Sequence, residues 1–188
     1  MRLSPAQKKQ ILETARKSIE HYSSGNGILP DPGCGEEALC EPRGVFVTLR
    51  KNGRLRGCIG RIFPDEKLYL AVRDMAVESA FRDPRFSPVT PEELKEIDIE
   101  ISALTVPEKA GSAQEIELGR DGVIIRRGIN QGVYLPQVAS ETGWDLEEFM
   151  GSLCSGKAGL ERDAWKDPET EILTFRAEVF SEKEMGLR

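Results

Sequence analysis

A cysteine between two glycines is the feature of this sequence with the clearest chemical potential. Cys58 lies in the run LRGCIG at residues 55–60, in a segment rich in β-forming residues. In a strand, Arg56 lies on the same face as Cys58, roughly 6–7 Å away along the chain. A guanidinium at this range lowers the pKa of a thiol and also binds phosphate or carboxylate. Cys58 is therefore a candidate nucleophile or redox thiol, with Arg56 as its activator and anion holder.

A purely structural role for Cys58 is the alternative. Cysteine is among the most buried residue types, and the pairing described below places Cys58 opposite Val47 on an apolar patch. The two glycines indicate a close backbone approach, a bulge or room for a ligand. The arginines of this strand could serve only to prevent pairing with another sheet. The residues alone leave both interpretations open.

The strand that carries Cys58 is predicted to be the second half of a β-hairpin over residues 45–61. Asn52-Gly53 is the strongest short hairpin turn, and β-rich runs flank it on both sides. Counting outward from a two-residue turn gives the register. It pairs Leu49 with Arg56, Val47 with Cys58, Val45 with Gly60, Thr48 with Gly57 and Phe46 with Ile59.

The remaining pattern predicts helices and further strands around this hairpin. Ser4, Pro5 and Gln7 form a capping-box start for a first helix, which Gly25 ends. Periodicity and capping predict a loop over 24–42, helices over 65–82, from Thr90 and after Asp145, and strands over 97–103, 123–127, 132–135 and 171–180. This order favours an α+β fold with a mainly antiparallel sheet and flanking helices.

Composition excludes several classes of protein. The 188 residues carry a net charge of −6, which disfavours bulk nucleic-acid or anionic-membrane binding. No apolar run approaches the roughly 18 residues of a membrane span, and the amino end lacks a signal-peptide core. We therefore expect a cytoplasmic protein that binds neither nucleic acid nor membrane. The sequence predicts no oligomeric state.

The histidine and cysteine counts limit the chemistry further. The one histidine, His21, excludes a site with two histidine ligands, and we expect it to be a surface or helix-capping residue. In a cytoplasmic protein, free thiols are the expected state of the four cysteines, Cys34, Cys40, Cys58 and Cys154. Their spacing is poor for a zinc site. We expect no metal and no cofactor.

Several separated motifs, in the same order, resemble the AMMECR domain family, whose microbial members are called AmmeMemoRadiSam system protein A. The resemblance covers about residues 6–182. It rests on LRGCIG at 55–60, Phe46-Val47-Thr48-Leu49, Asp83-Pro84-Arg85-Phe86, Leu135-Pro136-Gln137-Val138, Trp144, Lys157-Ala158-Gly159-Leu160 and Trp165.

The resemblance implies a fold and an association rather than an activity. The fold is α+β with a larger and a smaller lobe, so we expect one AMMECR domain over residues 1–188, either undivided or made of two closely packed lobes. Family members are associated with a Memo-like protein and a radical S-adenosylmethionine enzyme. The LRGCIG hexapeptide is the segment usually suggested as the functional site.

Four further residues in the matching motifs are candidate ligand-binding residues. Asp83 and Arg85 flank a fixed turn, and they form either a ligand clamp or an internal ion pair, with Phe86 in the core. Gln137 lies where a strand meets a helix, next to free backbone N–H groups that bind anions, but it could equally satisfy a neighbouring backbone group. Lys157 lies on a glycine-rich bend that lacks the full phosphate-loop pattern.

Two functions follow as hypotheses. The first is an accessory or regulatory module associated with Memo-like and radical S-adenosylmethionine proteins. The second is an enzyme or anion-binding protein that uses a pocket at Cys58 and Arg56. Nucleic-acid binding through the basic hairpin is disfavoured by the net charge. Trp144 and Trp165 are predicted to be packing residues rather than stacking platforms.

Overall fold

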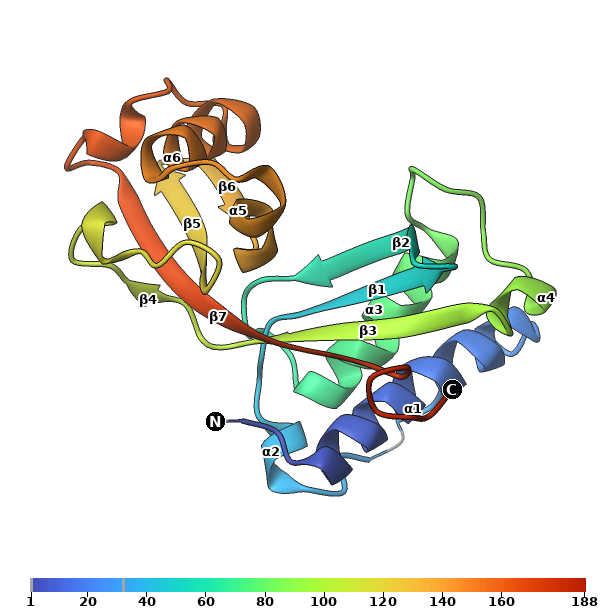
Figure 1. Ribbon diagram of the computed structural model, residues 1–188. Helices are drawn as coiled ribbons and strands as arrows, with labels where there is room; N and C mark the ends of the chain where they lie inside the picture. Colours follow the sequence, from blue (N-terminus) through green and yellow to red (C-terminus); the bar gives the residue numbers. More distant parts are fainter. Residues whose placement is uncertain (1, 32) are drawn as a thin grey trace. The chain divides into compact units, whose positions relative to one another are not determined.

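Antiparallel strands with flanking helices make up residues 2–31 and 33–188, which the computed structural model describes (Figure 1). This confirms the predicted α+β class with its mainly antiparallel sheet. The chain divides into two compact units. Unit 1 contains the residues up to Leu104 together with Glu178–Arg188, and unit 2 contains Thr105–Ala177. The organisation as one domain of packed lobes stays a prediction.

Unit 1 is built on three neighbouring strands, β1 (Val45–Lys51), β2 (Arg54–Arg61) and β3 (Ile97–Leu104). The central strand β1 pairs antiparallel with both of the others. Helices α1 (Pro5–Ser23) and α3 (Leu68–Phe81) lie across one face of these strands (Figure 1). Alternate residues of each strand therefore enter the core between sheet and helices.

Two of the predicted helix starts of unit 1 are confirmed, whereas the helix predicted over 65–82 begins only at Leu68. Ser4 and Gln7 form the capping box of α1, and Thr90 and Glu93 form that of the short helix α4 (Pro91–Leu94). The α1 helix ends just before Gly25, whose φ of 80° suits glycine. The region predicted as a loop over 24–42 contains one short helix, α2 (Glu37–Cys40), that the sequence pattern did not reveal. Pro32 of that region lies outside the described residues.

The expectation of four free thiols is wrong for two of the cysteines. Cys34 and Cys40 form a disulfide, with their Cα atoms 5.4 Å apart. Leu39 near the end of α2 is fully buried in the core. Gln10 of α1 donates a hydrogen bond to the Cys34 carbonyl oxygen. These contacts bring two cysteines of an irregular segment within bonding range. Cys58 and Cys154 are free.

Unit 2 has its own core beneath a second group of strands, β4 (Glu108–Lys109), β5 (Asp121–Arg127), β6 (Asn130–Tyr134) and β7 (Glu171–Ser181), of which β7 runs on into unit 1. The strand β5 pairs antiparallel with β6 and β7. Helices α5 (Pro136–Thr142) and α6 (Leu146–Leu153) cover these strands together with the short helical turns η1 (Ala113–Glu115), η2 (Cys154–Ala158) and η3 (Ala164–Lys166). Trp144 and Trp165 pack against this core, as predicted.

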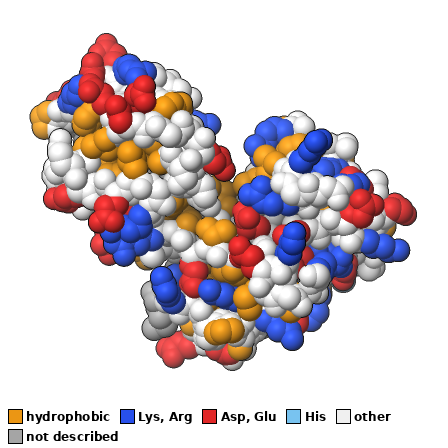
Figure 2. All heavy atoms as spheres, viewed as in Figure 1, with side chains coloured by type: hydrophobic (Ala, Val, Ile, Leu, Met, Phe, Trp, Pro, Cys, Tyr) orange, Lys and Arg blue, Asp and Glu red, His pale blue; other side chains and the backbone are white. Residues whose placement is uncertain are grey.

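The surface carries charges of both signs. Figure 2 shows Lys and Arg side chains interspersed with Asp and Glu on the visible face of each unit. Many of these charges are close enough to form ion pairs, and in some of these pairs both side chains are exposed. Within the described part of the chain, no helix has the length and apolar character needed to cross a membrane.

Candidate functional site

The hairpin that carries Cys58 turns where the sequence predicts, but its register differs by one residue. Asn52 and Gly53 have positive φ values, 53° and 77°, as a tight two-residue turn requires. Beyond the turn a β-bulge leaves Arg56 without a paired residue on β1, because Arg50 pairs with Leu55 while Leu49 pairs with Gly57. The predicted pairs beyond the bulge, from Leu49 with Arg56 onwards, are therefore wrong.

The bulge changes the face on which Cys58 lies. Cys58 is opposite Thr48, not opposite Val47 as predicted. Val47 faces the core and is fully buried, whereas Cys58 is half-buried. The Thr48 hydroxyl donates a hydrogen bond to Cys58 Sγ across 3.3 Å. The thiol thus has a polar neighbour instead of the apolar patch that the structural interpretation required.

The backbone of Cys58 is held on both sides by one short turn. Asp83 Oδ2 accepts the Cys58 N–H at 2.8 Å, and Arg85 Nη2 donates to the Cys58 carbonyl oxygen at 3.0 Å. Asp83 and Arg85 are also bonded to each other, with Nε–Oδ1 and Nη2–Oδ2 distances of 2.9 and 2.7 Å. The Asp83–Arg85 pair therefore closes the free edge of β2 at Cys58.

Asp83 is the buried member of this pair. Its side chain is almost inaccessible, while that of Arg85 is about half exposed. Hydrogen bonds from the Arg85 guanidinium, together with the N–H groups of Cys58 and Arg85, hold the pKa of Asp83 far below its ordinary value of 3.8. Phe86, which we expected in the core, is only half-buried and lies beneath the guanidinium groups of Arg56 and Arg85.

Arg56 is directed towards α4 rather than towards the thiol. Its Nη2 and Nε donate to the two carboxylate oxygens of Glu93 at 2.9 and 3.2 Å, and Lys51 reaches the same carboxylate. These donors, Arg56 first, lower the pKa of Glu93 to about 2. Among the described residues, no hydrogen bond links Arg56 to Cys58. One nitrogen, Arg56 Nη1, is buried without a partner in this part of the chain.

Both glycines of the hexapeptide are explained by close approach. A Cβ on Gly57 would lie 2.2 Å from the carbonyl oxygen of Ser79 in α3, and a Cβ on Gly60 would lie 2.3 Å from the Phe46 ring. The Ser79 hydroxyl also donates to Val47 O at 2.7 Å and accepts from Ile59 N at 2.9 Å. Helix α3 is thus bonded directly into the hairpin.

Gln137 and Lys157 belong to unit 2, unlike the other four predicted site residues. Gln137, in α5, has an Oε1 atom that is buried and has no hydrogen-bond partner among the described residues. Lys157 is exposed on the turn η2, with Nζ 6.0 Å from the centre of the Tyr134 ring. The structure therefore brings together Cys58, Asp83 and Arg85, places Arg56 beside Glu93, and holds Gln137 and Lys157 in a separate unit.

Three residues that sequence reasoning missed complete the surroundings of Cys58. They are Thr48, Ser79 and Glu93. Glu93 was visible as a capping-box residue, but nothing in its spacing indicates the second bond to Arg56. Thr48 would have been found with the correct register. No group of three or more His, Cys, Asp or Glu side chains is placed to hold a metal ion within residues 2–31 and 33–188.

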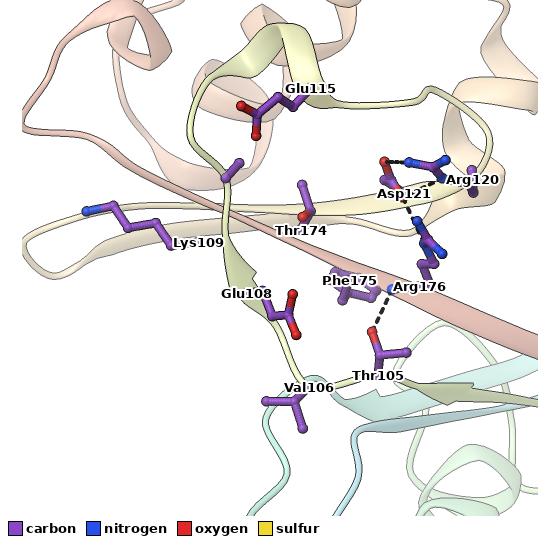
Figure 3. Close-up of a pocket in the computed structure, with 11 residues that line it drawn as sticks. Thr105, Val106, Glu108, Lys109, Glu115, Arg120, Asp121, Thr174, Phe175 and Arg176 are labelled. Carbon is purple, nitrogen blue, oxygen red and sulfur yellow. Dashed lines mark hydrogen bonds and ion pairs between the residues drawn. The ribbon is translucent and has the colours of Figure 1, made fainter. Parts of the chain in front are cut away.

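Cavities occur in both units. In unit 1 a cavity of about 490 Å³ includes Ile59, Gly60 and Arg61 of β2 in its lining. In unit 2 a cavity of about 440 Å³ is lined by charged residues of β4, β5 and β7 (Figure 3). Here Arg120 and Arg176 both point to Asp121, with N–O distances of 2.9 and 3.5 Å. Arg120 also contacts Glu117, so the charges of that cluster compensate one another.

Comparison with known proteins gives a consistent family relationship. The family model AMMECR1 matches residues 12–180. A protein of Methanothermobacter thermautotrophicus is 44% identical over 186 residues, covering 96% of each chain, and one of Thermococcus kodakarensis is 42% identical over 183 residues, covering 92% of this chain and 89% of that one. The crystal structure of an uncharacterised protein from Pyrococcus horikoshii is similar with a TM-score of 0.88 and 39% identity, covering 96% of this chain and 94% of the other.

Proposed function

This chain belongs to the AMMECR1 family, and we propose that it is an accessory or regulatory module that binds partner enzymes through unit 1. The partner classes are those associated with the family it resembles, a Memo-like protein and a radical S-adenosylmethionine enzyme. In this proposal the LRGCIG hexapeptide and the turn around Asp83 form a rigid recognition element.

The observation that carries the proposal is that the charged groups around the hexapeptide are already engaged. Arg56 is bonded to Glu93, while Asp83 and Arg85 hold the backbone of Cys58. Groups committed to internal bonds are poorly placed to bind and activate a substrate, but they do keep a surface in one shape. A pre-formed surface lowers the ordering cost of association.

Exposed apolar side chains at both ends of β2 are suitable contacts for a partner. Leu55 is 41% exposed near the hairpin turn, and Phe63 is 38% exposed just after the strand. A few well-packed residues contribute most of the binding energy in typical interfaces. We therefore expect these two residues to lie within the recognition surface.

Binding of purified partners tests the proposal. The chain is mixed with a purified Memo-like protein or a radical S-adenosylmethionine enzyme from the same organism, and complex formation is measured by sedimentation velocity and calorimetry. Leu55→Ser and Phe63→Ser should weaken binding about tenfold or more. Ile129→Ser is the matched control, because Ile129 is fully exposed but lies in unit 2. The absence of a complex with either partner would contradict the proposal.

A second candidate, an enzyme or anion-binding protein using Cys58 and Arg56, has two observations in its favour. The Thr48 hydroxyl donates to Cys58 Sγ, and Arg56 Nη1 has no partner among the described residues. The rate of alkylation of each cysteine against pH, read by mass spectrometry, separates the two functions.

The same measurement contains its own reference. Burial raises the pKa of the Cys154 thiol, so Cys154 should react slowly in the native protein. Fast alkylation of Cys58, with an apparent pKa well below ~8.5 that rises in Thr48→Val, would favour the enzyme. Alkylation of Cys58 only on unfolding would remove that candidate and leave the binding module.

A further inference from the structure

Two buried polar atoms in unit 2 have no hydrogen-bond partner among the described residues, and their side chains line the same cavity. The atoms are Trp165 Nε1 and Thr170 Oγ1. The cavity has a volume of about 490 Å³ and lies between the turn η3, the start of β7 and the segment around η1. Thr170 is more than nine-tenths buried.

Unpartnered atoms of this kind are uncommon in folded proteins. More than about 90% of buried polar groups find a protein or water partner, and a group left alone destabilises the native state. An indole N–H can only donate, whereas a hydroxyl can donate or accept. An acceptor oxygen from outside the chain is therefore the group that would satisfy both atoms together.

The charge of the lining favours an anion. The two ammonium–carboxylate contacts of Lys166, to Glu147 and Asp163, are both 2.9 Å long. Glu147 and Asp163 lie outside the lining, whose one carboxylate among the described residues, Asp167, accepts from Arg127 at 2.9 Å. Lys166 and Asp167 thus each have a partner of opposite charge, which leaves Lys109 among the charged residues of the lining.

Lys109 carries the charge that is not compensated. It is exposed and forms no ion pair with any other described residue. Figure 3 shows its ammonium group extending away from the cluster of Arg120, Asp121 and Arg176 that lines the neighbouring cavity. The lining that contains Trp165 and Thr170 therefore has one positive charge in excess.

The rest of the lining is largely apolar. It includes the indole of Trp165, Pro168 and Ile172, with Ala110 and Ala113 on the opposite segment. Cavities of about 300–1,000 Å³ that combine apolar walls with a few polar groups are typical of small-molecule sites. An inorganic ion would leave these walls uncovered, whereas an organic anion would cover them.

We propose that this cavity binds a small organic anion. Its carboxylate or phosphate oxygens accept hydrogen bonds from Trp165 Nε1 and Thr170 Oγ1, and its apolar part lies against Pro168 and Ile172. Lys109 supplies the opposing charge. This ligand site lies wholly within unit 2 and is independent of the partner binding proposed for unit 1, so either can fail without the other.

The indole N–H resonances of the two tryptophans provide a direct readout. The ¹⁵N-labelled protein is titrated with phenylacetate and with phenyl phosphate, and the neutral probe is phenylacetamide. The Trp165 indole resonance, assigned with Trp144→Phe, should shift saturably with at least one of the two anions and not with the amide. The Trp144 indole resonance should not follow the titration.

Variants locate the site. Thr170→Val keeps the shape of the side chain and should weaken anion binding about fivefold or more. Because the hydroxyl it removes has no partner, the melting temperature of the ligand-free protein should not fall. Lys109→Gln should weaken binding about threefold and reduce its salt dependence. The control is Thr142→Val, whose hydroxyl donates to Val138 O within α5, and it should bind normally.

Three results would overturn the proposal. The first is an indole resonance of Trp165 that neither anion shifts at millimolar concentration, as expected for a cavity that holds only water. The second is equal binding by Thr170→Val and Thr142→Val. The third is equal saturation by inorganic phosphate and by the organic probes, because the apolar walls would then contribute nothing.

Discussion

The surroundings of Cys58 in unit 1 and the cavity at Trp165 in unit 2 contrast in how their polar groups are satisfied. Around Cys58 the Asp83 carboxylate, the Ser79 hydroxyl and most of the Arg56 guanidinium have partners within the chain. At the cavity, two buried donors have none among the described residues. Satisfied buried networks fix a structure, whereas unsatisfied ones lower stability until a ligand binds. We therefore expect the surroundings of Cys58 to keep a fixed shape and the cavity at Trp165 to bind a ligand.

The largest effect should come from removing the Asp83 carboxylate. Asp83→Ala leaves the Cys58 N–H and the Arg85 guanidinium without their acceptor, so the free energy of unfolding should fall by about 2–4 kcal/mol. Urea denaturation measures the loss. Asp65→Ala is the control, because the Asp65 carboxylate is exposed and should change the same quantity by less than about 0.5 kcal/mol. Equal effects of the two variants would remove the structural role assigned to the pair.

Adding one methyl group to a glycine should lower the free energy of unfolding in unit 1 but not in unit 2. Gly57→Ala forces a Cβ to within 2.2 Å of Ser79 O, so we expect a loss of about 1–3 kcal/mol in the free energy of unfolding. In unit 2 the nearest atoms to a Cβ on Gly156 are 3.9 Å away, so Gly156→Ala should be nearly neutral. Thermal and urea unfolding of both variants test this. A neutral Gly57→Ala would show that α3 and the hairpin are not held at contact distance.

Acid should destabilise unit 1 through its carboxylates. The pKa of Glu93 is about 2 in the folded chain against an ordinary value of 4.5, and that of Asp83 is lowered in the same direction. The unfolded chain therefore binds more protons than the folded chain between about pH 5 and pH 2, and the free energy of unfolding must fall as pH falls through this window. Urea midpoints at several pH values test the sign. Glu93→Gln should flatten the curve, and an unchanged slope would contradict the ion pair with Arg56.

The smallest effect is expected where a hydroxyl has no partner. Thr170→Val should change the free energy of unfolding by less than about 0.5 kcal/mol, while Ser79→Ala should lose about 1 kcal/mol because its hydroxyl bonds both Val47 and Ile59. Urea denaturation of both variants without added ligand measures the two changes in the free energy of unfolding. A loss in Thr170→Val as large as that in Ser79→Ala would mean that the Thr170 hydroxyl is satisfied, and the contrast between the two regions would disappear.

Elements defined by nearby residues could be predicted from the sequence. The capping boxes at Ser4 and Thr90, the Asn52-Gly53 turn and the alternating strand from Ile97 are all present as predicted. Each depends on residues within a few positions of one another, so the chain reveals it locally. The helix α2 and the disulfide Cys34–Cys40 were missed, because both depend on how an irregular segment lies against α1.

The candidate site was only partly predictable for the same reason. Cys58 and the turn at Asp83 could be singled out by residue type, but the bond between them joins residues 25 positions apart. The bulge at Arg56 accompanies an ion pair to Glu93, 37 positions away, and no local pattern indicates it. A one-residue error in register was enough to place the thiol on the wrong face.

That bulge also makes the hairpin sensitive to its length. Side chains alternate along β2. Deleting Arg56 would only remove the bulge and keep Cys58 opposite Thr48, but inserting one residue between the turn and Gly57 would shift the pairing by one and turn the strand over. Cys58 would then point into the core beneath α3, and Ile59 would point outward. Substitutions in this stretch leave the count of residues unchanged, but insertions and deletions do not. We therefore expect this hairpin to accept many changes of side chain but not an added residue between the turn and Gly57.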